Sequence, residues 1–119
     1  MNNSILPKGV TRYCLKDMIG GWFIGSFIPT AWSTTDVEVA VQTFDAGYQG
    51  QDHHHLIATE ITLLLSGRAR MADVELNPGD ILTLQPGTPS TFEALEACTT
   101  VVVKHPGVLN DKYTNNGKN

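Results

Sequence analysis

The sequence predicts an all-β protein, a barrel or sandwich built from short strands. Glycine and proline recur at short intervals, with 11 glycines and 6 prolines in 119 residues. The runs between them are rich in β-branched and aromatic residues, which is typical of strands bounded by turns. Helical periodicity is weak, and only residues 11–18 have room for a turn or two of helix. Many short strands at regular spacing favour a barrel or a sandwich.

Seven runs are expected to form strands. In the second run, Val37, Val39 and Val41 alternate and therefore share one face. The third run, 60–66, is apolar on both faces, which suits a central strand. In chain order the expected strands cover residues 22–28, 37–44, 60–66, 68–71, 74–76, 80–85 and 99–104.

Length and charge limit the classes of function. A chain of 119 residues fills one domain, with a core at about residues 20–106 and with fraying expected at both ends, including the polar last ten residues. The formal charge of −4 argues against a basic surface for nucleic acid or for anionic membranes. No apolar run approaches the ~20 residues of a membrane span, and the first residues do not resemble a signal peptide. With two cysteines expected to be reduced thiols, the sequence predicts a soluble, cytoplasmic protein.

The segment 47–67 carries the side chains that could bind a metal or take part in a reaction. Residues two apart in a strand point to the same face, so His53 and His55 project together and His54 projects the other way. Glu60 opens the next strand, and a hairpin between the two strands would bring its carboxylate back over both imidazoles. Two histidines and a carboxylate can hold a divalent metal and leave other positions open. The alternative is a surface histidine cluster that precedes a buried strand.

The same residues match a family pattern. The first cupin motif, G-x5-H-x-H-x4-E-x6-G, is matched at every spacing by Gly47, His53, His55, Glu60 and Gly67. Residues 78–92, PGDILTLQPGTPSTF, follow the second motif, P-G-D-x5-P-G-x-P-H-x-F. The chain therefore resembles a small single-domain cupin. That resemblance implies a double-stranded β-helix, also called a jelly-roll barrel. It also implies a metal held by His53, His55 and Glu60.

One position departs from the cupin pattern. The second motif normally supplies a histidine as the fourth metal ligand, and here that position is Ser90, whose hydroxyl is a poor ligand. Three outcomes follow: a metal held by three residues with water beside them, a substitute ligand, or no metal at all. The substitutes to consider are His54, Gln42 and Asp52. The residues do not distinguish among metals, because iron, manganese, nickel and zinc all accept imidazole and carboxylate ligands.

Strand alternation also predicts the lining of the pocket. Tyr48 and Glu60 are candidates for acid–base chemistry, although packing at the rim is the plainer role for Tyr48. The apolar segment 21–29 exceeds what a small barrel covers easily, so we expect it to form the seam of a homodimer. The pocket is expected to be lined by Gln42, Phe44, Thr62, Leu64, Met71 and Phe92.

The resemblance leaves three functions open, because a fold does not fix a function. The first is a metal-dependent enzyme of dioxygenase, lyase or isomerase type that acts on a small molecule. The second is a non-catalytic binding or sensor module for a sugar or a carboxylic acid. The third is a metal-independent sugar isomerase or epimerase, which would need an acid–base pair from Tyr48 and His53 or His55. The sequence names neither the substrate nor the pathway.

Overall fold

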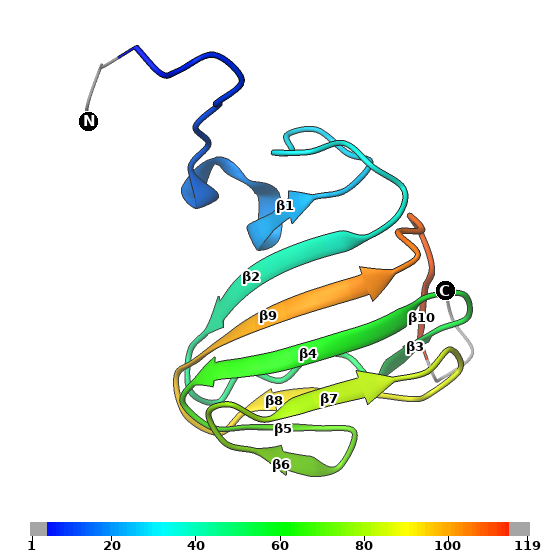
Figure 1. Ribbon diagram of the computed structural model, residues 1–119. Helices are drawn as coiled ribbons and strands as arrows, with labels where there is room; N and C mark the ends of the chain where they lie inside the picture. Colours follow the sequence, from blue (N-terminus) through cyan, green and yellow to red (C-terminus); the bar gives the residue numbers. More distant parts are fainter. Residues whose placement is uncertain (1–4, 115–119) are drawn as a thin grey trace.

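The computed structural model describes residues 5–114, and the fold is almost entirely β (Figure 1). All strand pairs within its sheets are antiparallel. The largest sheet has the order β1 (Trp22–Ile24), β2 (Glu38–Phe44), β9 (Cys98–His105), β4 (Thr59–Ser66) and β7 (Ile81–Leu84). A second sheet has the order β6 (Val74–Leu76), β5 (Ala69–Met71) and β8 (Phe92–Ala94), and β3 (His53–His55) pairs with β10 (Lys112–Thr114). The all-β prediction is therefore confirmed.

The strands of the large sheet alternate between an inner and an outer face. On β4 the side chains of Glu60, Thr62 and Leu64 are buried, whereas their neighbours along the strand are more exposed. The strand lies between β9 and β7, as its apolar sequence predicted. On β2, Glu38 and Ala40 are the buried residues, so the alternating valines of this strand lie on its outer, less buried face.

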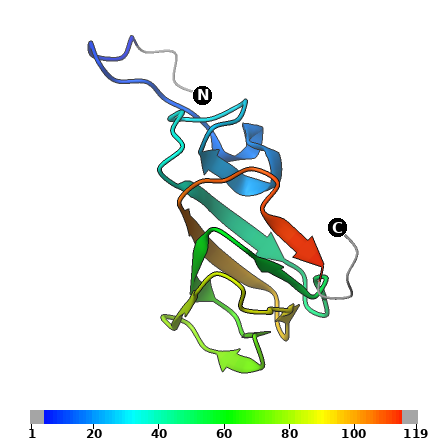
Figure 2. The same cartoon turned by 90° about the vertical axis from the view of Figure 1, so that its right-hand side faces the viewer.

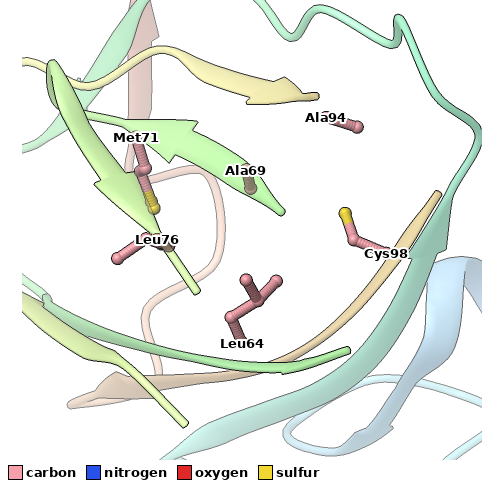
Figure 3. Packing of buried hydrophobic residues seen from close by; sticks show 6 residues of the cluster. All are labelled: Leu64, Ala69, Met71, Leu76, Ala94 and Cys98. Carbon is pink, nitrogen blue, oxygen red and sulfur yellow. The ribbon is translucent and has the colours of Figure 1, made fainter. Parts of the chain in front are cut away.

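The apolar core lies between the two larger sheets at one end of the barrel (Figure 3). Leu64 from the large sheet points toward Met71 and Leu76 of the small one. Two alanines let the backbones approach closely, because a methyl group fills little space. The buried cluster consists of Leu64, Ala69, Met71, Leu76, Ala94 and Cys98. This packing closes one end of the barrel and leaves the inner face of the other end for polar side chains.

Gly67 makes the turn that joins β4 to the small sheet. Its φ of +79° lies in the left-handed region that favours glycine. A Cβ added there would lie 2.1 Å from the carbonyl oxygen of Ala97 and 2.8 Å from the Cβ of Cys98. No other residue fits without moving the backbone, which explains physically why the motif ends in glycine.

The expectation of one or two helical turns within residues 11–18 is met by a single 3-10 turn. Residues 11–18 contain one short 3-10 turn, η1 (Leu15–Asp17), followed by η2 (Ile19–Gly21). Figures 1 and 2 show residues 5–21 at the end of the molecule opposite β5 and β6. Within residues 5–114, no helix is long and apolar enough to cross a membrane. Cys14 is exposed and Cys98 is buried, and both are free thiols.

The expectation for the C-terminal segment was wrong in part. Residues 112–114 form β10, which pairs with the histidine strand β3. Tyr113 stacks on His54 with ring centroids 5.8 Å apart, and this contact helps to hold the segment in place. Fraying was also predicted for the first few residues and for the end of the chain, and residues 1–4 and 115–119 lie outside the described part.

Candidate metal centre

The structure brings together the three residues that the first motif singled out. Each of His53, His55 and Glu60 offers a donor atom within 4.8 Å of the other two. The Nε2 atom of His55 lies 3.1 Å from Oε1 of Glu60, and both side chains are buried. His53 is half-buried, and its ring stands nearly perpendicular to that of His55 at a centroid distance of 5.3 Å.

The carboxylate of Glu60 reaches the histidines by a corner between sheets, so the expected hairpin was wrong. β3 pairs with β10, whereas β4 pairs with β7 and β9. Asp111 holds the corner: its carboxylate accepts hydrogen bonds from the backbone N–H groups of Leu56, Ile57 and Ala58 at 2.9–3.2 Å. Burial alone would raise the pKa of Asp111, but these three donors lower it below its usual value. Sequence reasoning missed Asp111, since no local pattern connects it to a corner more than 50 residues earlier.

Both imidazoles are oriented by main-chain carbonyls. The Nδ1 of His53 lies 2.9 Å from the carbonyl oxygen of Gln51, and the Nδ1 of His55 lies 2.9 Å from that of Asp111. A carbonyl oxygen only accepts hydrogen bonds, so each Nδ1 carries the proton and donates. Each Nε2 is then the ring nitrogen that faces the site, where it can bind a metal once it carries no proton. Outer contacts of this kind orient histidine ligands at metal sites.

The charge states suit metal binding as well. Burial would raise the pKa of Glu60, but the hydrogen bond from His55 Nε2 and the positive charge of that ring when it is protonated, with a hydrogen bond from Thr62 Oγ1 at 3.1 Å, lower it below its usual value. Burial lowers the pKa of His53, and the positive charge of Lys112 acts in the same direction. At neutral pH the carboxylate is therefore ionised and His53 is neutral, which are the protonation states that a metal requires.

The donor set fits a divalent cation. A lone pair of His55 Nε2 facing a carboxylate oxygen at 3.1 Å is unfavourable unless a proton or a cation lies between them. Neighbouring ligands of one ion, each about 2.1 Å from it, lie about 3.0–3.5 Å apart, so this pair already has that spacing. Any separation near the 4.8 Å limit therefore involves His53, the more exposed member.

Ser90 lies beside this donor set. Its backbone N–H and C=O exchange hydrogen bonds with those of His53, at 2.7 and 2.9 Å, so the two side chains share a face. The serine is 3% exposed, and its Oγ has no hydrogen-bond partner within residues 5–114. The recess between Ser90 and the three donors holds no water-sized volume.

The suggested substitute ligands are engaged elsewhere. His54 stacks on Tyr113, away from the two histidines beside it. Asp52 accepts a hydrogen bond from Thr91 at 2.8 Å. Gln42 donates its amide to a main-chain carbonyl at 3.0 Å.

A cavity of about 300 Å³ adjoins the three donors. Of the expected lining residues, Leu64 does not reach the cavity, because the small sheet covers its stretch of β4 and buries it in the apolar core. Tyr48 lies at the wall, 46% exposed, with its ring centroid 4.8 Å from that of Phe44. The residues that line the cavity as expected are Gln42, Phe44, Thr62, Met71 and Phe92.

Two lysines in the cavity wall were missed by sequence reasoning. Lys104 of β9 and Lys112 of β10 both line it. Alternation along β9 places Lys104 on the same face as the buried Thr100 and Val102, and that pattern was the available signal. Arg68, in contrast, lies outside the cavity in exposed ion pairs with Glu75 and Glu96.

Comparisons with known proteins agree on the fold. No protein-family model and no curated protein matches the sequence. An uncharacterised protein with a double-stranded β-helix domain from Klebsiella pneumoniae has 26% identity and a TM-score of 0.59, over 66% of this chain and 72% of its own. The DMSP lyase DddQ from Ruegeria pomeroyi has 20% identity and a TM-score of 0.65, over 82% of this chain and 51% of its own. Oxalate decarboxylase from Bacillus subtilis, an enzyme with Mn(II) centres, has 18% identity and a TM-score of 0.60, over 69% of this chain and 25% of its own.

The chain therefore has the double-stranded β-helix fold of the cupins, as the spaced motifs predicted. Its structural neighbours include enzymes that act on small molecules. This chain spans about half the length of the lyase and a quarter of the decarboxylase. The likeness accordingly assigns the architecture, and the activity has to be argued from the residues of this chain.

Proposed function

We propose that this protein is a small metal-binding cupin that holds a divalent ion on His53, His55 and Glu60 and binds a small molecule in the adjoining cavity. The observation that supports this most is the buried pair of His55 Nε2 and Glu60 Oε1, 3.1 Å apart, with both histidines anchored through Nδ1. The Mn(II) centres of a neighbour with the same fold are consistent with a divalent metal. Iron, manganese, nickel and zinc all suit this donor set.

The cavity suits an enzymatic role. A bound divalent ion would supply a Lewis acid for oxygen atoms of a substrate. The side chains of the chain itself would bind and orient that substrate. Gln42, Thr62 and Thr100 line the cavity with polar groups, and Tyr48 is the candidate for moving a proton at its hydroxyl. A lyase, isomerase or dioxygenase type of reaction fits such a site.

A non-catalytic binding or sensor module is the second candidate. The observation in its favour is the position of Ser90, which leaves three ligands where cupins have four, beside a recess with no room for water. In such a module the ion would serve only to hold the ligand. Catalytic turnover of a small molecule by the metal-loaded protein, lost on removal of the metal, separates the two.

Metal analysis of untagged protein, purified without added metal or chelator, tests the proposal. We expect about one divalent ion per folded chain in the wild type and at least a tenfold loss in His53→Ala and Glu60→Gln. His54→Ala is the matched control, because its imidazole stacks on Tyr113 instead of facing the donors, and it should retain the ion. Equal metal content in His53→Ala and His54→Ala, or metal-free folded wild type that takes up none of the four metals, would overturn the proposal.

The homodimer remains a prediction. Its support is the exposure of large apolar side chains in and around residues 21–29: Ile19 is 71% exposed, Ile28 92% and Trp32 71%. Large apolar side chains that are exposed in one region of the chain are typical of association sites when they form a patch.

A further inference from the structure

The charges that line the cavity are unusual for this chain. The chain carries a formal charge of −4, yet its cavity wall holds two lysines, Lys104 and Lys112, against one carboxylate in the wall itself, Glu60, and a second, Glu38, that pairs with Lys104. A divalent ion on Glu60 would make the wall more positive still. A positive concavity in an acidic protein favours an anionic ligand, because it concentrates negative charge where the rest of the surface repels it.

Lys104 occupies the middle of a row of charges across the inner face of the large sheet. The strand register places it directly opposite Glu38 on β2 and directly opposite Glu60 on β4. Side chains in directly opposed positions share a face and lie within reach of each other. Lys104 therefore stands between the carboxylate of the candidate metal centre and a second, buried carboxylate.

The ammonium group of Lys104 lies near a carboxylate and an aromatic ring but forms no hydrogen bond with either. Its Nζ lies 3.7 Å from Oε1 of Glu38, beyond hydrogen-bond distance, and 4.7 Å from the ring centroid of Trp22. Within the described residues it has no hydrogen-bond acceptor, although an ammonium has three donors to satisfy. Its side chain is 17% exposed and lines the cavity, so these donors are open to a molecule that enters it.

Glu38 is under-satisfied in the same way. It is 5% exposed, and its Oε2 has no hydrogen-bond partner within residues 5–114. The Lys104–Glu38 pair is open at 3.7 Å, whereas a charge-assisted hydrogen bond between two such groups is about 2.8 Å long. The open pair instead leaves the lysine donors available to an oxygen that enters the cavity.

We propose that the cavity binds small carboxylic acids, with Lys104 donating hydrogen bonds to a ligand carboxylate and Lys112 adding positive charge at the mouth. The inference builds on the proposed function, because it names the ligand class of the same cavity. The lysines hold their places without any metal, however, so the two ideas can fail separately. A cavity of about 300 Å³ restricts the ligand to a small acid.

Titration calorimetry with malonate and malonamide tests this inference. The two probes match in size and shape and differ in charge. We expect metal-loaded wild type to bind malonate at least tenfold more tightly than malonamide, and Lys104→Gln to reduce that preference several-fold, with the remainder due to the ion. Lys16→Gln deletes an exposed lysine outside the cavity and should leave the preference unchanged. Lys112→Gln should weaken malonate binding about threefold, because this lysine is exposed and partly screened by salt.

A second variant guards against a folding defect. Lys104→Gln alone leaves Glu38 buried without a countercharge, so Glu38→Gln/Lys104→Gln removes both charges together and should show the same reduced preference for malonate. Equal binding of the two probes by folded wild type, or an unchanged preference in the folded double variant, overturns the inference.

Metal content measured on the same samples separates the two proposals. Metal-loaded protein that does not distinguish the probes overturns the carboxylate site and leaves the metal centre standing. Folded protein that takes up none of the four metals and still prefers malonate through Lys104 overturns the metal centre and supports the carboxylate site.

Discussion

The two ends of the barrel are built from the same strands and yet differ in chemistry. Along the inner face of β4, Glu60 and Thr62 belong to the polar end, whereas Leu64, two residues further on, lies in the apolar core. Along β9, Lys104 faces the cavity and Cys98 packs in the core. On β4, two residues along the inner face therefore separate the candidate metal centre from the packed core.

The two ends are also held together differently. The apolar end is closed by the small sheet, and its stability comes from buried area and close packing. The polar end is held by directed contacts: two imidazoles on carbonyl oxygens, and a corner whose N–H groups all bind Asp111. Substitutions at the first end, away from the cavity-lining Met71, should change stability alone, whereas those at the second should change stability and ligand binding together.

The largest effect on stability is expected for Leu64→Ala. Leu64 is fully buried, and a leucine-to-alanine change in a core costs about 2–5 kcal/mol through lost burial and the cavity left behind. Urea unfolding measures this loss, and the metal content of the folded fraction should not change. Leu65→Ala is the matched control, because Leu65 is 50% exposed and its loss should cost less than about 1 kcal/mol. Equal losses in the two variants would show that the core does not close the apolar end.

Asp111→Ala should have the next largest effect and should act on both properties. It leaves the N–H groups of Leu56, Ile57 and Ala58 without their acceptor, at a cost of about 2–3 kcal/mol. The corner carries His55 on one side and Glu60 on the other, so metal affinity should fall about tenfold or more. Urea unfolding and competition with a metal-binding dye measure the two effects.

Asp111→Asn is the graded control for this prediction. It keeps one acceptor oxygen, so it should lose less stability and less affinity than the alanine variant. If Asp111→Ala destabilised the fold with unchanged metal affinity, the corner would support the barrel without positioning the ligands.

Much of the site could be predicted because its signals are local. The period-two rule places His53 and His55 on one face, and the spacing to Glu60 and Gly67 matches a family pattern. Gly67 shows why such a pattern persists in physical terms, since a Cβ there would collide with the carbonyl of Ala97. These inferences depend on the residue types within one short segment, residues 47–67.

The remainder depends on contacts between distant parts of the chain. Asp111 reaches a corner 53–55 residues earlier, and β10 is three residues long, too short for a hydrophobic pattern to reveal it. Lys104 was available to the alternation rule, but its row with the two glutamates appears only from the strand register. The alternation rule also placed Leu64 correctly on the inner face. It wrongly placed this residue in the cavity wall, because alternation does not say where along a strand a cavity ends.

The smallest effect is expected for Ser90→Ala, and it tests where the polar end stops. The Oγ of Ser90 is buried without a partner in the described part of the chain, so its removal deletes no hydrogen bond there and should change stability by less than about 1 kcal/mol. Thr62→Val is the matched comparison, because that hydroxyl donates to Glu60 at 3.1 Å and its loss leaves a carboxylate oxygen less satisfied. Metal content should stay the same in Ser90→Ala. A tenfold loss of metal there would make the serine a fourth ligand, and the polar end would then extend across the bridge from His53 into the loop that precedes β8.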